Sequence, residues 1–186
     1  LIYFHQQLCS KAGKLLVVAS GPRAEYDKVQ PLLAALGRSA MYVGEGELSR
    51  IWKIAHNTMF GVIIQSLCEI TLLAEKAGIP RNVFLESINR SVLGSMYTPS
   101  QPPGLVPLDF TTTFTPKLLL KDLELGMGAA KAQGVTMPTA SVTRESLQSL
   151  ANQYPGDIDF SVLLLELARA AGMKLEPENV KVGDGL

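Results

Sequence analysis

The stretch ELSRIWKIAHNTMFGVIIQSLCEITLLAEK, residues 47–76, decides the fold of this chain. It is followed by Ala77-Gly78-Ile79-Pro80, which places glycine and then proline where helices usually end. At 1.5 Å per residue the stretch predicts a helix that is ~45 Å long. Because the helix is apolar on most sides, we expect it to run through a helical bundle or to be covered by a second subunit.

Further helices are predicted downstream, at about residues 80–92, 116–133, 138–153 and 159–171. Several of them begin at proline or aspartate and end near glycine. Residues 94–113 contain four prolines and predict a long loop, which inside a compact domain is usually functional or mobile. The tail from residue 173 onward is polar, and we expect it to be poorly ordered.

The first 43 residues have a different pattern. The apolar run at residues 15–19 ends at a Ser-Gly-Pro turn and predicts a buried strand. Residues 24–36 are apolar at three- and four-residue steps, which predicts an amphipathic helix, and residues 40–43 predict a second strand. A strand-helix-strand piece cannot bury itself, so we expect it to be the trailing edge of a larger α/β sheet. The predicted fold class is mainly α, a bundle around one long helix preceded by this short α/β piece.

Composition argues against several classes of protein. Of 186 residues, 17 are basic and 17 acidic, with no basic run, which argues against a nucleic-acid surface. Cys9 and Cys68 have neither the spacing of a zinc site nor that of a disulfide framework, so we expect no metal and a reducing, cytoplasmic location. No signal-peptide pattern opens the chain. The run 54–68 is shorter than the ~20 apolar residues of a membrane span, so we expect a buried helix and no membrane.

The motif Gly44-Glu45-Gly46-Glu47-Leu48-Ser49 stands between a predicted strand and a predicted helix, as a dinucleotide fingerprint would. However, the third glycine is replaced by Ser49, and glutamates stand where a pyrophosphate would approach. The next segment is also a single long helix instead of a ~30-residue βαβ unit. The motif therefore predicts a tight turn into a helix.

Two groups of polar residues are candidates for chemistry. Lys53, His56 and Asn57 stand at positions i, i+3 and i+4, so they share one helix face. Apolar neighbours would lower the pKa of Lys53 toward neutrality, which suits a general acid–base. The spacing alone favours a solvated lysine near a helix end, with His56 and Asn57 bound by water or by neighbours.

The second group is the adjacent pair Lys121-Asp122, with Phe114 shortly before it. Adjacent residues diverge on a helix, so we expect different partners: a phosphate or carboxylate for Lys121, and a neighbouring helix for Asp122. Without other information, the pair itself favours a plain surface charge pair.

The order of these motifs resembles the C-terminal domain of the β-hydroxyacid dehydrogenases, the family of 3-hydroxyisobutyrate and 6-phosphogluconate dehydrogenases. The resemblance covers most of residues 13–172 and rests on three motifs: Gly44-x-Gly46-x6-Lys53-x2-His56-Asn57, Glu69-x3-Leu73-Ala74-x2-Ala77-Gly78 and Phe114-x6-Lys121-Asp122-Leu123-x-Leu125. It implies hydride transfer between NAD or NADP and a small hydroxyacid or aldehyde-acid substrate, in a homodimer or tetramer.

The resemblance also implies roles for individual residues. Lys53 would be the catalytic acid–base, and Asn57, with His56 beside it, would hold the substrate. Lys121 would lie by the nicotinamide end of the cofactor, with Phe114 and Asp122 flanking the same cleft.

The implied domains are the end of a dinucleotide-binding Rossmann domain at 1–43, an all-helical substrate and dimerisation domain at 44–172, and a tail at 173–186. No full dinucleotide-binding domain precedes Lys14, so we expect the chain alone to be inactive. The family's Ser-Gly-Gly stretch would fall near Phe4-His5-Gln6, which does not match it. His56 stands where the family usually has asparagine.

Two other functions fit the same residues. The long apolar helix fits a non-catalytic helical oligomerisation module, and a desolvated Lys53 also suits a Schiff-base nucleophile.

Overall fold

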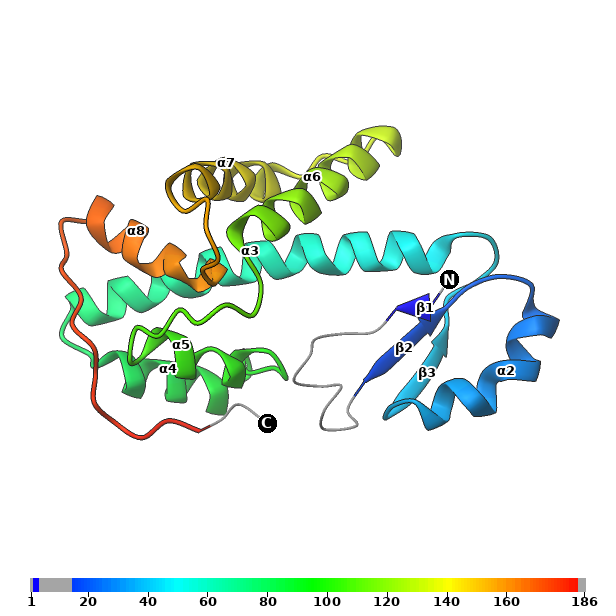
Figure 1. Ribbon diagram of the computed structural model, residues 1–186, viewed down its shortest axis with the longest axis horizontal. Coiled ribbons are helices and arrows are strands. Elements are labelled where there is room, and N and C mark those ends of the chain that lie inside the picture. The colour runs from blue at the N-terminus through cyan, green and yellow to red at the C-terminus, as the bar shows by residue number, and fades with distance from the viewer. Residues whose placement is uncertain (1, 4–14, 184–186) are drawn as a thin grey trace. The chain divides into compact units, whose positions relative to one another are not determined.

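The computed structural model describes residues 2–3 and 15–183 (Figure 1). The predicted fold class, mainly α with a short α/β piece before the long helix, is confirmed. In chain order the elements are β1 (Ile2–Tyr3), β2 (Leu16–Ala19), α2 (Arg23–Ala35), β3 (Ser39–Tyr42), α3 (Leu48–Lys76), α4 (Arg81–Arg90), the 3-10 turn η1 (Thr98–Ser100), α5 (Pro102–Leu105), α6 (Pro116–Ala132), α7 (Pro138–Gln153), the 3-10 turn η2 (Phe160–Val162) and α8 (Leu163–Ala170).

The chain divides into two compact units, one up to His56 and one from Asn57 onward. The division falls inside α3, so this helix belongs to both units. The domain boundaries expected from the sequence, at residues 43 and 172, remain a prediction.

The first unit is built on a small sheet in the order β1-β2-β3. Strands β2 and β3 pair in parallel, with Leu16 opposite Ser39, and α2 connects them. Its core contains Val17, Ala19 and Leu33. The strand-helix-strand prediction is confirmed, but the sequence did not predict β1, which pairs antiparallel with β2. A two-residue strand is too short to show an alternating pattern.

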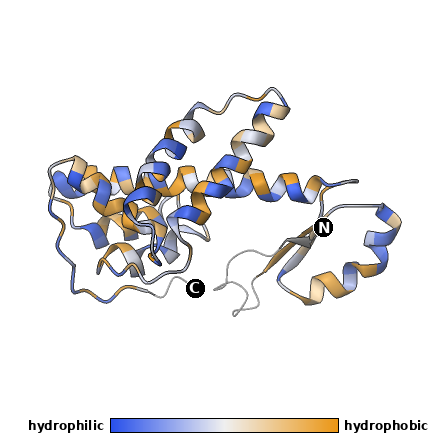
Figure 2. Ribbon diagram, turned by 45° about the horizontal axis from the view of Figure 1, so that its top comes forward, coloured by the Kyte–Doolittle hydropathy of each residue, from blue (hydrophilic) through white to orange (hydrophobic). Residues whose placement is uncertain are grey.

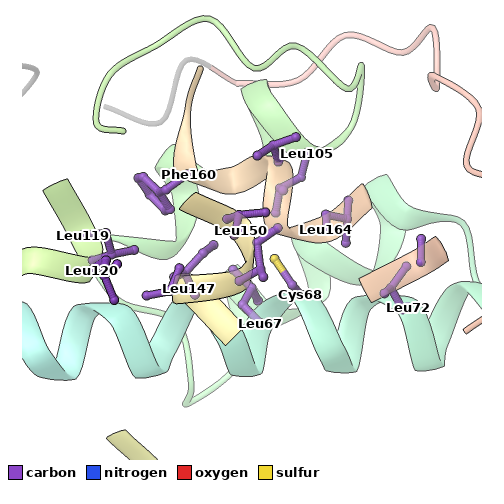
Figure 3. Packing of buried hydrophobic residues seen from close by; sticks show 14 of the residues in the cluster. Leu67, Cys68, Leu72, Leu105, Leu119, Leu120, Leu147, Leu150, Phe160 and Leu164 are labelled. Atoms are coloured by element: carbon purple, nitrogen blue, oxygen red, sulfur yellow. The ribbon is translucent and has the colours of Figure 1, made fainter. Parts of the chain in front are cut away.

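The second unit packs around the C-terminal part of α3. Figure 1 shows α3 between α4 and α5 on one side and α6, α7 and α8 on the other. Figure 3 shows side chains of α3 meeting those of α5, α6, α7 and α8 in one hydrophobic cluster, to which Leu85 of α4 also belongs. The members of this cluster that are fully or nearly fully buried include Ile64, Cys68, Leu105, Leu119, Leu123, Leu147 and Leu164. Each fully buried leucine stabilises the fold by about 1.5–3 kcal/mol.

Two glycines bring α3 and α6 into close contact. A Cβ atom on Gly126 of α6 would lie 1.9 Å from Thr58 Oγ1 on α3. A Cβ atom on Gly61 of α3 would lie 2.3 Å from Leu123 Cδ1 on α6. A Cβ atom at either position would force its neighbour to shift, so glycine here serves the packing of the two helices and not a special backbone conformation. The two helices are therefore held close together at the level of Asn57.

Among the described residues, α3 is the one helix that is long and apolar enough to cross a membrane. The sequence prediction counted only the uncharged run 54–68 and called it too short, whereas the helix itself has 29 residues. Figure 2 shows apolar residues along much of α3, and half of its most apolar window is buried inside the protein. A core helix has the same composition, so the burial of Ile64, Leu67 and Leu72 accounts for the apolar character of α3.

The prediction of a plain loop at residues 94–113 is wrong in part, because η1 and α5 lie within it. Both begin with proline in the first turn, where its missing N–H costs nothing. Ser95 Oγ accepts hydrogen bonds from the backbone N–H groups of Tyr97 and Thr98, which starts the first of these turns.

The prediction of a poorly ordered tail is also wrong for residues 174–183. Here the chain has no regular secondary structure but is tied to α4. The backbone N–H of Glu178 donates to the carbonyl oxygen of Val106 at 3.0 Å, and the buried Arg81 guanidinium donates to the carbonyl oxygen of Glu176 at 2.7 Å. Leu175 and Val182 also pack against the hydrophobic cluster. We call residues 174–183 the C-terminal strap.

Candidate active site

The glycine motif before α3 forms a tight turn. Gly44 and Gly46 have φ angles of 117° and 64°, which favour glycine. Ser20 Oγ donates to the Gly46 carbonyl at 2.8 Å and accepts from the Ser49 backbone N–H at 3.1 Å. These hydrogen bonds hold the turn that leads into α3, which agrees with the prediction of a tight turn before the helix.

Helix α3 carries Lys53, His56 and Asn57 within one and a half turns. All three side chains are half-buried. Lys53 and Asn57 are four residues apart on a continuous helix, which puts them on one face. The His56 imidazole stacks on the Trp52 indole, with ring centroids 5.0 Å apart and planes at 22°. This stack fixes the position of the imidazole along the helix surface.

Asn57 is bound to α6 by a short hydrogen bond. Its Nδ2 atom donates to Asp122 Oδ2 at 2.6 Å across the contact between the two helices. The Asp122 side chain is only 7% exposed, so water competes little for this carboxylate. An ionised carboxylate can only accept, and therefore the amide must present its nitrogen to Asp122. The prediction that Asp122 anchors a neighbouring helix is confirmed.

Lys121 also contacts Asp122. Its ammonium lies 3.1 Å from Asp122 Oδ1, while the lysine side chain is 58% exposed. The expectation that these adjacent residues serve different partners is therefore wrong for Lys121. The four-carbon stem of lysine is long enough to turn back toward the next residue even though the two Cβ atoms diverge. Asp122 thus holds Asn57 with one oxygen and Lys121 with the other.

Phe114 has a different environment. Its ring packs edge to face on Phe160, with centroids 6.3 Å apart, and both belong to the hydrophobic cluster of the second unit. Its backbone N–H donates to Asp159 Oδ2 at 3.2 Å. Of the six predicted site residues, direct contacts join Asn57, Lys121 and Asp122.

Asp159 was not among the predicted site residues, although it orders the approach to α6. Its Oδ2 atom accepts hydrogen bonds from the backbone N–H and hydroxyl of Thr113, at 3.0 and 2.7 Å. Its Oδ1 atom accepts from the backbone N–H and hydroxyl of Ser161. The local pattern Asp-Phe-Ser is a usual cap and predicts only the Ser161 contacts. The contacts with Thr113, 46 residues away, have no local signal.

Other reactive groups in the described residues contribute no further site. Burial raises the pKa of the Cys68 thiol well above its ordinary value, so the thiol is unreactive. Within residues 2–3 and 15–183, no three His, Cys, Asp or Glu side chains are grouped so that they could hold a metal ion. The Ser-Gly-Gly comparison at Phe4-His5-Gln6 lies outside the described residues.

Comparison with known proteins decides the family. The family described as the NAD-binding domain of NADP-dependent 3-hydroxyisobutyrate dehydrogenase matches residues 48–172. The chain belongs to this family. The match starts at the first residue of α3 and ends just after α8, so it includes Lys53, Asn57 and Asp122. Members of this family are NAD(P)-dependent oxidoreductases.

Several relatives are similar over most of the chain. Glyoxylate/succinic semialdehyde reductase 2 of Arabidopsis thaliana, a chloroplast protein, is 28% identical over 159 residues, which are 85% of this chain and 44% of the relative. The mitochondrial 3-hydroxyisobutyrate dehydrogenase of Drosophila melanogaster is 30% identical over an alignment of 163 residues, which covers 83% of this chain and 50% of the relative. The chain therefore spans about half the length of the curated relatives it matches.

Solved structures have the same fold. The 3-hydroxyisobutyrate dehydrogenase of Salmonella typhimurium superposes with a TM-score of 0.79 at 25% identity, covering 89% of this chain and 59% of that one. The Mycobacterium tuberculosis 3-hydroxyisobutyrate dehydrogenase gives a TM-score of 0.75 at 22% identity, covering 89% of this chain and 60% of that one. At that identity the second comparison supports the fold alone.

Proposed function

We propose that this chain supplies the catalytic helical part of an NAD(P)-dependent 3-hydroxyacid dehydrogenase, which acts on a β-hydroxyacid or a related small acid. The observation that carries the proposal is the contact of Asn57, Asp122 and Lys121 across α3 and α6, with Lys53 one turn before Asn57. These four residues belong to the region that matches the family. Two helices that only support the fold usually pack through apolar side chains, whereas here a half-buried lysine, an amide and a buried carboxylate lie within about one turn of each other.

Lys53 is the proposed general acid–base. In oxidation its neutral amine takes the proton of the substrate hydroxyl while the same carbon gives up hydride, and the hydroxyl becomes a carbonyl. In reduction the ammonium returns the proton to the forming alkoxide. The bound nicotinamide supplies the hydride chemistry. A half-buried lysine suits this role, because an amine can take up and return a proton and its cation stabilises a developing oxyanion.

Asn57 and His56 are the proposed substrate contacts. The Asn57 amide is held by Asp122 and lies one turn from Lys53, so a hydroxyl on one substrate could meet both side chains. His56 is fixed by its stack on Trp52 and could limit the size of the substrate on its side. A rigid amide beside an acid–base favours a small polar acid over a plain alcohol.

The cofactor site on this chain is proposed to comprise Lys121 and Phe114, with Asp122 beside them. The Lys121 ammonium is largely exposed and tethered, which fits an anionic or carbonyl group of NAD or NADP. Phe114 is an aromatic residue that is only partly buried and stands just before α6. Asp122 acts from beneath the surface. These groups can touch only one end of a dinucleotide.

A homodimer or tetramer in the cytoplasm is proposed for the working form. Ile51, Met59 and Leu73 on α3 are 44%, 64% and 72% exposed, respectively. Large apolar side chains at several points along one helix favour cover by a second subunit. The same observation favours the second candidate function, a helical oligomerisation module without catalysis.

A substrate screen separates the two functions. The protein is expressed from its complete coding sequence and incubated with NAD+ or NADP+ and a panel of small hydroxyacids, each paired with the alcohol that lacks its carboxylate. The dehydrogenase proposal predicts reduced cofactor absorbance at 340 nm with at least one acid and none with its paired alcohol. A folded oligomer without turnover or saturable binding on any acid would instead support the oligomerisation module.

A further inference from the structure

We infer that Asp122 is a positioning residue of the proposed active site, which aligns the Asn57 amide and the Lys121 ammonium without touching substrate or cofactor itself. The inference rests on the proposed function for its chemistry and on the contacts of Asp122 for its geometry. The family resemblance implies that Asp122 flanks the cofactor cleft, whereas here Asp122 is inferred to hold the residues that line the cleft.

Both carboxylate oxygens of Asp122 have partners in the chain. Oδ2 accepts from Asn57 Nδ2 at 2.6 Å, and Oδ1 lies 3.1 Å from Lys121 Nζ. With 7% of its side chain exposed, Asp122 offers little surface to a ligand. Lys121, in contrast, exposes 58% of its side chain. A ligand at this surface therefore meets Lys121 and Asn57, and Asp122 acts on it through them.

The carboxylate also decides which way the Asn57 amide points. A 180° turn of the amide would set its oxygen against Asp122 Oδ2, and two acceptors without a proton repel each other. The amide oxygen is consequently kept on the side away from Asp122. An asparagine with one permitted orientation presents the same donor and acceptor to every incoming substrate, which is the preorganisation that a catalytic site requires.

The packing of α3 against α6 makes this support rigid. The contacts of Thr58 with Gly126 and of Gly61 with Leu123 lie next to the Asn57–Asp122 bond, within the turn that follows Asn57 on α3 and the turn that follows Asp122 on α6. Neither helix can slide without moving these contacts, so the distance from amide to carboxylate is fixed by the core. Because the packing of the helices fixes Asp122, Asp122 in turn fixes Asn57 and Lys121, the two side chains that face the ligand.

The inference is tested with Asp122→Asn in the complete protein, against Glu124→Gln as the control. Glu124 lies two residues away on α6, and its 3.0 Å ion pair with Arg144 is on the surface. Asp122→Asn is expected to lower kcat/KM for the acid substrate ~10–100-fold, mainly through KM, as a small misplacement of a binding group does. Glu124→Gln is expected to stay within ~2-fold, as surface ion pairs contribute little. Equal kinetics in the two variants would overturn the inference.

The rate at which side-chain amide protons exchange with solvent is a second measurement, which can be made on the wild type alone and does not depend on turnover. In the wild type, the Asn57 amide proton bound to Asp122 should exchange more slowly than the amide protons of the exposed Asn152. In folded Asp122→Asn that protection should be weaker, because the new side chain has one acceptor oxygen in place of two and no negative charge. Equal exchange at Asn57 and Asn152 in the wild type would overturn the inference. A protected Asn57 amide in a protein that turns over no hydroxyacid would support the geometry of Asp122 and refute the proposed function.

Discussion

The C-terminal strap offers the sharpest test of how the second unit is held together. Helix α4 begins after Pro80, whose side chain has no hydrogen-bonding group and so cannot cap the helix. The Glu178 carboxylate takes this place from 97 residues away: its oxygens accept from the backbone N–H groups of Arg81 and Asn82 at 2.7 and 2.9 Å. The strap therefore supplies the helix cap that the local sequence lacks.

Replacing Glu178 with alanine removes both bonds and the negative charge at the helix start. Loss of an N-cap costs about 0.5–2 kcal/mol, and loss of a charge that matches the helix dipole costs ~0.3–1 kcal/mol. We therefore expect Glu178→Ala to lower the free energy of unfolding by ~1–2 kcal/mol, since the two effects overlap. For a chain of this size, that lowers Tm by ~2–8 °C.

A substitution of Arg81 tests the other contact between the strap and α4. The Arg81 guanidinium is fully buried and donates to the Glu75 carboxylate and to two carbonyl oxygens, those of Val106 and Glu176. Arg81→Met leaves Glu75 and both carbonyls without this donor, and breaking such a buried pair costs ~3–5 kcal/mol. Burial already raises the pKa of the Glu75 carboxyl, Arg81 opposes that shift and Glu178 adds to it.

Urea unfolding followed by far-ultraviolet circular dichroism measures these effects, because most of the helices belong to the second unit. The control is Glu86→Ala, which removes an exposed ion pair with Arg90 on the same helix and should cost no more than ~0.5 kcal/mol. If Glu178→Ala is no less stable than Glu86→Ala, the strap does not cap α4 and the reasoning fails.

Two further predictions concern α6 and α8. In thermal unfolding, Gly126→Ala should destabilise the protein by ~1–3 kcal/mol, because the new Cβ atom would overlap Thr58. Gly128 faces open space, so Gly128→Ala should stabilise the protein by ~0.5–1 kcal/mol. Equal effects of the two substitutions would contradict the close contact of α3 and α6. The pKa of the Glu166 carboxyl is lowered, chiefly by its hydrogen bonds from Arg169, so its stabilising contribution is present above the ordinary value of 4.5 and is lost as pH falls through the lower folded value. The difference in Tm between wild type and Glu166→Gln should accordingly shrink as the pH falls below about 4.5, and a constant difference would show that Glu166 gains nothing from Arg169.

Features with a local cause could be predicted from the sequence. The long apolar run ending at Gly78 and Pro80 predicted α3 to within one residue at its start and correctly at its end. The i, i+4 spacing of Lys53 and Asn57 likewise placed both side chains on one face of that helix. These features depend on the period of the helix and on its end signals, which neighbouring residues contain.

Features that depend on distant residues could not be predicted. Asn57 and Asp122 are 65 residues apart, and nothing near either one shows that they meet. The strap appeared polar and unstructured because its acidic residues find their partners on α4, about 95 residues earlier. The prolines of residues 94–113 were interpreted as a loop, whereas proline in a first turn equally starts a short helix.

The role of Lys53 is the central claim, and its replacement by alanine tests that claim most directly. In the complete protein with the acid found by the substrate screen, Lys53→Ala should lower kcat at least ~100-fold, as loss of a general acid–base does, while the Kd for the cofactor barely changes. Lys117→Ala, which removes an exposed lysine from the first turn of α6, should retain wild-type kcat. A Lys53→Ala enzyme with kcat within a few-fold of the wild type would contradict the assignment of Lys53 as the acid–base.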